Sequence, residues 1–543
     1  MNKKRIFVLV ASLMIGNCAV QAETKQPNFV LILADDLGWV DISSDLATDG
    51  HGSEYYQTPT IDRLASQGVS FTHAYAMQNC APTRSAILTG QYPLRPYNGV
   101  YNVGSLNRPD KRTSVYPNLP IVPPKQRNDI SSESTSLHET LKAGGYDTSF
   151  FGKNHGAGES ENLTINHGVD FNFGTKAGPF IVGTVKGENV KSGFLAIEDD
   201  QDGWTFSIPA LNPYAQPYDA AYVENILEPV ANGNDPALVL GTPKHLTDAL
   251  GDAAVDFIEE RAGGAKPFFL YLPFHAVHVP IVARRDLIAK YKMLDPADHR
   301  HDHPVYAAMI ELMDQNVRKV LNALDDPNGD GNDSDSLSSN TLVLFTSDNG
   351  GFMGPTDNAP LRGRKGMFYE GGIRVPFICR WPGVISPGIV NREAVHCIDI
   401  YPSLADLGQA PVPDSSFQEL DGESLAPILL GRTETLTRES LFGHFPGYMD
   451  NRQRPNSVIR KRIQGNDYKL FYYYEDNRYE LYNLTEDLHE STNLLEGEYS
   501  KSVRQIAKQL SSDLRKWLVE GNAPTGIWAI NEEAVGYPSS EVF

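Results

Sequence analysis

The chain has 543 residues, of which 41% are hydrophobic and 21% are charged, and this balance is typical of a folded globular protein rather than a disordered one. The formal net charge is −21, which excludes a general electrostatic attraction to nucleic acid or to an anionic membrane surface. The four cysteines are too few for a disulfide scaffold, and a chain of this length does not need one.

The first 22 residues have the features of a secretory signal peptide. A basic start at residues 3–5 precedes an apolar run at residues 6–15. Residues 20–22 resemble the small-residue cleavage site of a signal peptide. The apolar run is too short to cross a bilayer. We therefore expect a periplasmic or secreted protein without stable membrane insertion. The alternative is a lipoprotein that is anchored through a lipid on Cys18, but Asn17 before it disfavours this.

Strands alternate with helices through the first two thirds of the chain. Residues 28–33 are continuously apolar, as in a parallel strand that is buried on both faces, and the carboxylates of Asp35 and Asp36 follow at once. Further strands are predicted at residues 148–151, 267–272 and 341–346, and helices at residues 58–68, 136–144, 247–260 and 306–324. This alternation predicts an α/β fold, with a large mixed or parallel sheet sandwiched by helices.

The pattern changes towards the end of the chain. Residues 468–474 and 479–482 are predicted hairpin strands, and residues 501–519 are a predicted helix that packs over them. We therefore predict a larger α/β domain over residues 23–432 and a smaller antiparallel α+β subdomain over residues 433–543. The last residues of this subdomain are expected to form a loose tail.

A family resemblance rests on six short motifs. Cys80-Ala-Pro-Thr-Arg84, followed by Leu-Thr-Gly at residues 88–90, resembles the signature of the type I sulfatases. Five further segments match that family in its own order, at residues 34–39, 152–155, 274–280, 347–350 and 361–376. Asn154 replaces the usual Trp of one motif, and Val277 replaces the Pro of another. The chain is identified as a member of this family, which implies an alkaline-phosphatase-like fold and hydrolysis of sulfate esters.

The resemblance implies a metal ion at the ends of two strands. Its ligands are Asp35, Asp36, Asp348 and Asn349, together with position 80. Carboxylate and amide oxygens suit a hard divalent cation, and the ends of parallel strands are where open α/β sheets place their sites. Calcium is the family's usual ion and magnesium is the alternative. Taken singly, each pair of residues also fits a plain turn or helix cap.

The resemblance further implies that Cys80 is converted to formylglycine, an aldehyde. One hydroxyl of its hydrate attacks sulfur, and the second expels sulfate as the carbonyl reforms. Asp348 helps to activate the hydrate, and Arg84 stabilises it together with the metal carboxylates. The implied partner for this maturation is a formylglycine-generating enzyme or an anaerobic sulfatase-maturating enzyme.

Four more residues receive catalytic roles from the matched motifs. Lys153 and Lys365 hold sulfate oxygens as point charges. His278 is the expected acid for the leaving oxygen, and His155 is expected to assist the elimination step. The motif selects His278 rather than its neighbour His275. An isolated histidine beside an apolar strand is otherwise more often a structural residue.

The expected substrate is a sulfated carbohydrate, such as an algal galactan, ulvan or a host glycosaminoglycan. His444 and Arg460 lie in the C-terminal part, where family members often complete the substrate pocket, and ordinary packing is the alternative for both. Basic clusters at Arg108–Arg112, Lys125–Arg127 and Arg284–Arg285 either receive further anionic groups or are solvated loops.

Two other functions stay open at this point. The first is a phosphate or phosphonate ester hydrolase of the same superfamily, and the second is a non-catalytic glycan-binding protein in which Cys80 never matures. Two structural questions also stay open. Cys379 and Cys397 could form a disulfide, and residues 326–335 resemble the first half of an EF-hand loop without its final Glu. A solvated insertion is the preferred interpretation of that loop, with a weak calcium site as the alternative.

Overall fold

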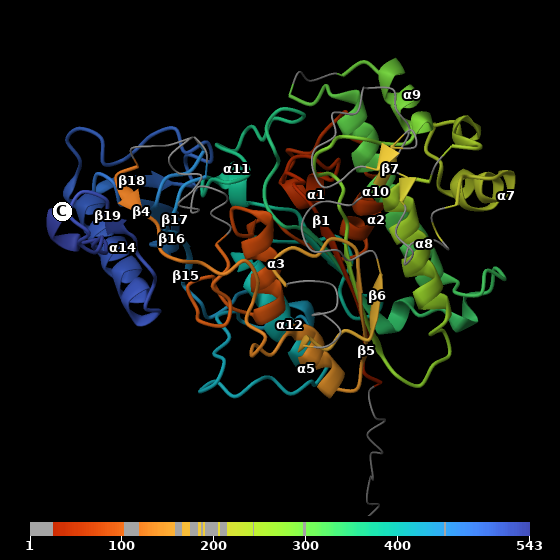
Figure 1. Cartoon of the computed structure of the whole chain (residues 1–543), viewed down its shortest axis with the longest axis horizontal. Coiled ribbons are helices and arrows are strands. Elements are labelled where there is room, and N and C mark those ends of the chain that lie inside the picture. The colour runs from red at the N-terminus through yellow and green to blue at the C-terminus, as the bar shows by residue number, and fades with distance from the viewer. Residues whose placement is uncertain are drawn as a thin grey trace, which may run out of the picture.

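The computed structural model describes residues 25–101, 119–157, 166–173, 216–242, 244–296, 300–449 and 452–543, with short pieces at 183–185, 188–189, 205–206 and 214. The predicted signal peptide and the basic cluster Arg108–Arg112 lie outside these residues. An eight-stranded mixed sheet runs through the larger part of the molecule (Figure 1). In spatial order its strands are β13 (Ile389–Asn391), β2 (Val69–Phe71), β12 (Phe377–Arg380), β11 (Thr341–Ser347), β1 (Asn28–Ala34), β10 (Phe268–Pro273), β5 (Asp147–Phe151) and β6 (Phe171–Phe173).

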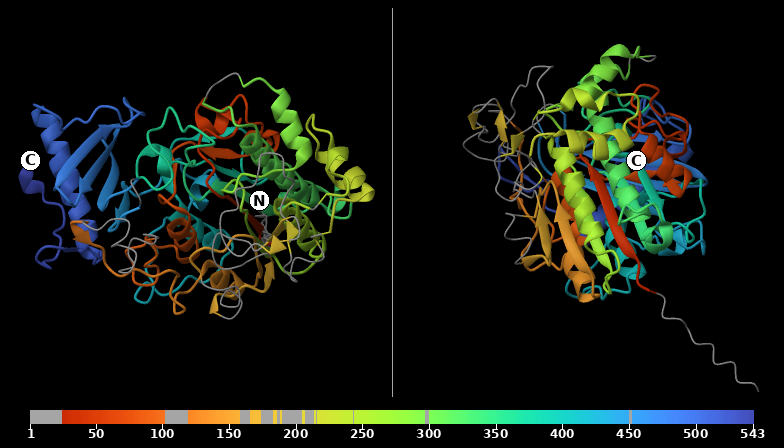
Figure 2. Two further views of the ribbon diagram at one scale, coloured as in Figure 1. Left: turned by 45° about the horizontal axis from the view of Figure 1, so that its top comes forward. Right: turned by 90° about the vertical axis from the view of Figure 1, so that its right-hand side faces the viewer.

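Strand β1 shows why this sheet needs helices on both faces. It pairs in parallel with β10 and β11, and all of its residues are buried. Phe29, Leu31 and Leu33 join one apolar cluster, whereas Val30 and Ile32 join another. Each face is covered by its own layer (Figure 2): α3 (Cys80–Thr89), α5 (Leu137–Ala143) and α12 (Ile400–Leu407) on one side, and α2 (Pro59–Ser66), α8 (Leu246–Glu259), α9 (Arg285–Met293) and α10 (Pro304–Asp325) on the other. The predicted α/β fold is confirmed.

A second, antiparallel sheet follows in the C-terminal part, apart from the first sheet in Figure 1. Its order is β15 (Ser440–Phe445), β16 (Asn456–Ile463), β17 (Asn466–Tyr473) and β18 (Arg478–Asn483). Helix α14 (Lys501–Glu520) packs against it through its buried residues, among them Leu510 and Leu514. The predicted hairpin is therefore correct and is part of a larger sheet, while the domain boundary at residue 432 stays a prediction.

The end of the chain is not a loose tail, so that expectation was wrong. Strand β19 (Ile527–Trp528) pairs with β4 (Ile121–Val122), which belongs to the first third of the chain. The Tyr537 hydroxyl donates to the carbonyl oxygen of Ala523 at 2.7 Å. Backbone pairing and side-chain contacts thus tie this segment to both parts of the molecule.

The remaining elements are short. They are α1 (Asp45–Thr48), β3 (Ala74–Tyr75), β7 (Gly183–Val185), β8 (Glu188–Asn189), β9 (Thr205–Phe206), α7 (Ala220–Tyr222), η3 (Val223–Leu227), η4 (Glu228–Val230), η5 (Pro236–Val239), η6 (Asp333–Asp335), η7 (Ser338–Asn340), α11 (Glu370–Ile373), β14 (Val395–His396), η8 (Cys397–Asp399), α13 (Ala426–Leu429) and η9 (Ser540–Val542). None of the described helices is both long enough and apolar enough to cross a bilayer.

Two questions that the sequence left open concern cysteines and a loop. Cys379 and Cys397 are both buried free thiols, so no disulfide joins them. The loop that resembles half an EF-hand is exposed, and it satisfies its own backbone: Asp326 Oδ2 accepts the N–H of Gly331 at 2.9 Å. This agrees with a solvated insertion, and the calcium alternative stays untested.

Asp314 on α10 joins two helices of the same layer, α10 and α2. Its wholly buried carboxylate accepts the N–H groups of Thr60 and Ile61, in the first turn of α2, at 2.9–3.0 Å. Burial raises the pKa of Asp314 to about 7, because these donors only partly replace the lost water.

The Asp314→Asn variant is expected to change the pH dependence of stability. An acid whose pKa is higher in the folded state than in the unfolded state stabilises the fold below its unfolded pKa, and this contribution is lost as pH rises through the folded pKa. The ordinary pKa of 3.8 and the folded pKa of about 7 bound the pH interval in which the wild type loses this stabilisation. As pH rises through this interval, the free energy of unfolding of D314N should therefore rise relative to that of the wild type. Urea denaturation at several pH values measures this difference, and parallel profiles would contradict it.

Candidate active site

Four oxygen-bearing side chains meet at the carboxyl edge of the central sheet. Asp35 and Asp36 follow β1, and Asp348 and Asn349 follow its parallel neighbour β11, with the two strands in register to their ends. The backbone N–H of Asp36 donates to Asp348 Oδ1 at 3.1 Å, and Asn349 Nδ2 donates to Asp36 Oδ1 at 2.9 Å. All four side chains are buried.

These donors fit a hard divalent cation. Asn349 Oδ1 is buried and has no hydrogen-bond partner, although buried amide oxygens are nearly always paired. Burial and the negative charge of Asp35 raise the pKa of Asp348 to about 6, against the opposing effect of Arg84. An unpartnered amide oxygen beside three carboxylates is the oxygen-only set that calcium or magnesium prefers.

Cys80 is the first residue of α3, and its thiol faces this oxygen cluster. Its Sγ lies 3.5 Å from Asp35 Oδ1 and 3.7 Å from Asp36 Oδ1, and the residue is 1% exposed. Burial and the nearby Asp348 carboxylate raise the pKa of the thiol well above its ordinary value. Because the thiolate is the reactive form of cysteine, this environment does not suit an ordinary cysteine nucleophile.

Arg84 lies one turn further along α3, and its guanidinium group offsets the negative charge of the carboxylates. Its Nε and Nη2 contact Asp348 Oδ2 at 2.8 and 2.7 Å, and its Nη2 lies 3.7 Å from Asp35 Oδ2. Its Nη1 donates to the carbonyl oxygen of Lys153 at 3.1 Å. The guanidinium is thus buried among fixed partners and orients both the carboxylates and the segment that carries Lys153.

Two lysines complete the cluster from other parts of the chain. Lys153 follows β5, and its Nζ donates to Asp35 Oδ2. Lys365 lies in the loop before α11, and its Nζ donates to Asp36 Oδ2 at 2.8 Å. Both residues are buried. Three cations from separate elements therefore converge on the same carboxylates.

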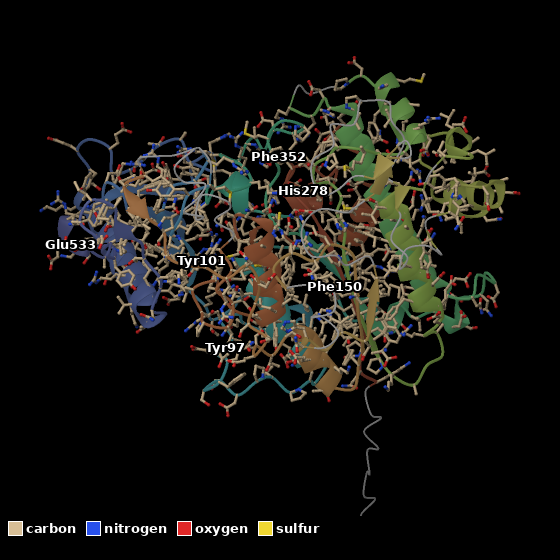
Figure 3. The ribbon with its side chains drawn as sticks, in the orientation of Figure 1. Tyr97, Tyr101, Phe150, His278, Phe352 and Glu533 are labelled. Carbon is tan, nitrogen blue, oxygen red and sulfur yellow. The ribbon has the colours of Figure 1, made fainter. Side chains whose placement is uncertain are left out.

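Two histidines border the cluster. His278 Nδ1 lies 2.6 Å from the carbonyl oxygen of Val279, so Nδ1 carries a proton and Nε2 faces Asp36 Oδ2 at 3.7 Å. Burial and the positive charge of Lys365 lower the pKa of His278 to about 3. Burial and Lys153 likewise lower the pKa of His155. His278 also lies with Asp35, Asp36 and Cys80 in one group whose ligand atoms are within 4.8 Å of one another, a group that does not include His275. Figure 3 shows His278 above α3 in that view.

The two substrate residues expected in the C-terminal part are not exposed in the structure. His444 is 2% exposed, and its ring nitrogens lie 2.7 Å from Ser457 Oγ and 2.9 Å from the carbonyl oxygen of Pro524. Arg460 is also buried, and its Nη2 contacts Asp467 Oδ2 at 2.9 Å. It lines a cavity of about 460 Å³ to which none of the expected catalytic residues contributes. His444 is thus enclosed by packing contacts and Arg460 belongs to a buried ion pair, while a substrate role for either residue stays a prediction.

The basic clusters also differ from one another. Arg284 is 2% exposed and is held by Asp248 and Asp286, so it is neither a solvated residue nor a free receptor for anions. Lys125 and Arg127 are exposed, and their role stays a prediction.

Met449 contacts the site without any signal in the sequence. It lies between β15 and β16, and Asn79 Nδ2, next to Cys80, is 3.7 Å from its Sδ. A Cβ at Gly366 would lie only 2.8 Å from the same sulfur, and φ at Gly366 is 91°, so this position after Lys365 needs glycine. No local pattern marks such a contact, because it depends on how the second sheet packs against the first.

Comparisons with known proteins agree with this arrangement. The family model described as Sulfatase matches residues 27–410, and the model described as N-sulphoglucosamine sulphohydrolase, C-terminal, matches residues 364–519. A curated protein named Sulfatase from Formosa agariphila is 51% identical over 99% of this chain and 97% of its own length. Human Arylsulfatase H is 30% identical over 78% of this chain and 75% of its own length. A solved structure described as Ps i-CgsB in complex with k-i-k-neocarrahexaose is 25% identical, with a TM-score of 0.63, covering 91% of this chain and 92% of the other.

The Arg84→Met variant is expected to lose about 3–5 kcal/mol of unfolding free energy, because it leaves buried carboxylates without their cation. Urea denaturation measures this loss. Arg454→Met is the matched control, since Arg454 also contacts a carboxylate, that of Glu475, at 2.7 Å but has a side chain that is 73% exposed. The control should lose less than about 1 kcal/mol. Equal losses in the two variants would contradict the expected effect.

Proposed function

Because this chain belongs to the sulfatase family and is a sulfuric ester hydrolase, we propose that it cleaves sulfate esters of a sulfated carbohydrate with an aldehyde formed from Cys80. The observation that carries this proposal is the position of Cys80. It begins a buried helix at the point where the oxygen cluster and the two lysines meet. A thiol with a raised pKa is rarely ionised there and is therefore a poor nucleophile. A hydrated aldehyde instead supplies one hydroxyl to attack sulfur and another to release sulfate.

The proposed cofactor is calcium, with magnesium as the alternative. Asp35, Asp36, Asp348 and Asn349 would hold it, since they supply only oxygen donors and one of them has an unpartnered amide oxygen. A bound cation would supply Lewis acidity at this site.

The chain's own residues bind sulfate and move its protons. Lys153 and Lys365 lie on the two sides of the cluster, at Asp35 and Asp36 respectively, and each offers an ammonium group to sulfate oxygens. A sulfate ester between these lysines adds negative charge beside His278 and thereby raises the proton affinity of Nε2. His278 Nε2 then carries the proton to the leaving oxygen, and His155 assists the release of sulfate.

The proposed substrate class is a sulfated polysaccharide fragment, from an algal source or from a glycosaminoglycan. Two likenesses support it: the solved structure bound to neocarrahexaose, and the C-terminal match to the N-sulphoglucosamine sulphohydrolase model. The basic start and apolar run before residue 23 support export to the periplasm or the medium, where such polymers are met. A formylglycine-generating or anaerobic sulfatase-maturating enzyme is the proposed maturation partner.

The Cys80→Ala variant is expected to fold and to reduce the turnover of an aryl sulfate to below about one thousandth of wild type. Cys379→Ala is the control, since Cys379 is an equally buried thiol on β12, outside the site, and should keep most of the activity. The mass of the tryptic peptide of residues 64–84 from the native host should show sulfur lost and oxygen gained. An unmodified thiol in active native material would contradict the proposed chemistry.

A panel of substrates tests the proposed class. We expect sulfate release from sulfated oligosaccharides derived from carrageenan, ulvan or glycosaminoglycans, with kcat/KM above that for an aryl sulfate, because binding of the remote sugar adds to transition-state stabilisation. Ion chromatography of free sulfate measures it. Aryl phosphate in the same assay tests the phosphate-ester alternative. Turnover of the aryl sulfate alone, with no oligosaccharide hydrolysed, would contradict the carbohydrate proposal.

A further inference from the structure

The loop that carries Lys365 is held at both ends by the C-terminal part of the chain. On the amino side of Lys365, Arg362 Nη1 donates to the carbonyl oxygen of Glu490 at 2.6 Å and to the hydroxyl of Tyr482 at 2.9 Å. On the carboxyl side, Glu370 begins α11 and meets residues of the same region. The loop therefore spans two attachment points on a sheet that contributes none of the catalytic groups proposed above.

The second attachment is a buried ionic cluster that centres on Lys469 of β17. Lys469 Nζ lies 2.9 Å from Glu370 Oε1 and 3.0 Å from Glu490 Oε1. Glu490 Oε2 accepts the backbone N–H of Glu370 at 2.7 Å. Glu370 also accepts a hydrogen bond from Tyr75 at 3.0 Å and lies 3.7 Å from Arg374. Lys469 thus bridges two carboxylates, and one of these carboxylates binds the backbone of the loop.

Burying this ionic cluster costs free energy of folding. The side chains of Lys469, Glu370 and Glu490 are at most 1% exposed, and burying charges costs several kcal/mol per ion before pairing offsets it. Glu490 has φ of 50°, a left-handed conformation that costs a residue other than glycine roughly 1–2 kcal/mol. Burial opposes ionisation of Glu370, yet Lys469 and Arg374 lower its pKa to about 2. Apolar residues of similar volume would pack these positions at less cost, but they would not define one position for the loop.

We propose that Lys469 and Glu490 are positioning residues for sulfate binding, which act by fixing the backbone from which Lys365 projects. The inference rests on the proposed role of Lys365 as a ligand of sulfate. Lysine is a point charge on a flexible stem, so the place of its ammonium group depends on the place of its backbone. A displacement of about 1 Å at a binding group can lower activity by roughly 100-fold.

The Lys469→Met/Glu490→Gln double variant tests this role. It removes the ammonium group that bridges the two carboxylates together with one of these carboxylates, and it leaves Glu370 paired with Arg374. We expect the inhibition constant of inorganic sulfate and the KM for an aryl sulfate to rise roughly 10- to 100-fold. The matched control is Lys290→Met/Glu311→Gln, another buried ion pair, whose Nζ and Oε2 lie 2.7 Å apart between α9 and α10. The control should lose stability but keep the wild-type inhibition constant.

A second variant guards against a double variant that does not fold. Arg362→Met changes an exposed side chain and releases the other end of the loop, so it should also raise the inhibition constant of sulfate. If a folded K469M/E490Q enzyme, or R362M in its place, keeps the wild-type constant, the contacts are merely structural and the inference is wrong. Failure of the proposed function is distinguishable, because Lys365→Met would then leave sulfate inhibition unchanged.

Discussion

Negative charge buried at the carboxyl edge of one sheet constrains much of this molecule. The parallel pairing of β1 with β11 brings the carboxylates of Asp36 and Asp348 to one place, away from water. Carboxylates this close repel one another and are stable only if cations reach them. Arg84 reaches them from α3, the helix that Cys80 begins, Lys153 from the end of β5 and Lys365 from the loop before α11. Each of these segments therefore brings a cation to the carboxylates, and this is the site proposed above for a divalent cation and for sulfate.

The C-terminal part is integrated into the site rather than appended to it. Met449 packs against the glycine that follows Lys365, and Lys469 and Glu490 hold the far side of the same loop. Strand β19 adds a backbone connection by pairing with β4. The backbone of the same loop is also held by the larger part of the chain, since the N–H of Lys365 donates to the carbonyl oxygen of Gly351 at 3.1 Å and that of Gly366 to the carbonyl oxygen of Gln78 at 2.6 Å. The position of Lys365 therefore depends on both parts of the chain.

Local signals predicted much of the fold, and the family motifs named the candidate residues of the central site. Continuous apolar runs indicated the strands of the large sheet, because a strand covered on both faces needs apolar residues at every position. The capping box at Ser136 and Glu139 marked the start of α5 and is present in the structure. The motif residues that follow β1 and β11 were expected at the ends of two strands, and the structure brings them together with Lys153, which follows β5 and was expected there only from the family resemblance. Export, formylglycine and the ion's identity stay predictions.

The residues whose surroundings the sequence alone did not determine share one physical cause. Whether a histidine or an arginine on a strand faces a pocket or a buried partner depends on long-range packing. Arg460 faces Asp467 across neighbouring strands. His444 is enclosed by the last part of the chain, which the sequence pattern had predicted to be a loose tail. The sequence by itself determined the family and the order of many elements and named the candidate reacting groups, because these depend on short motifs and on hydrophobic periodicity. Only the tertiary structure decided which buried charges lie around these groups, because an ion pair is defined by neighbours that lie far apart along the chain.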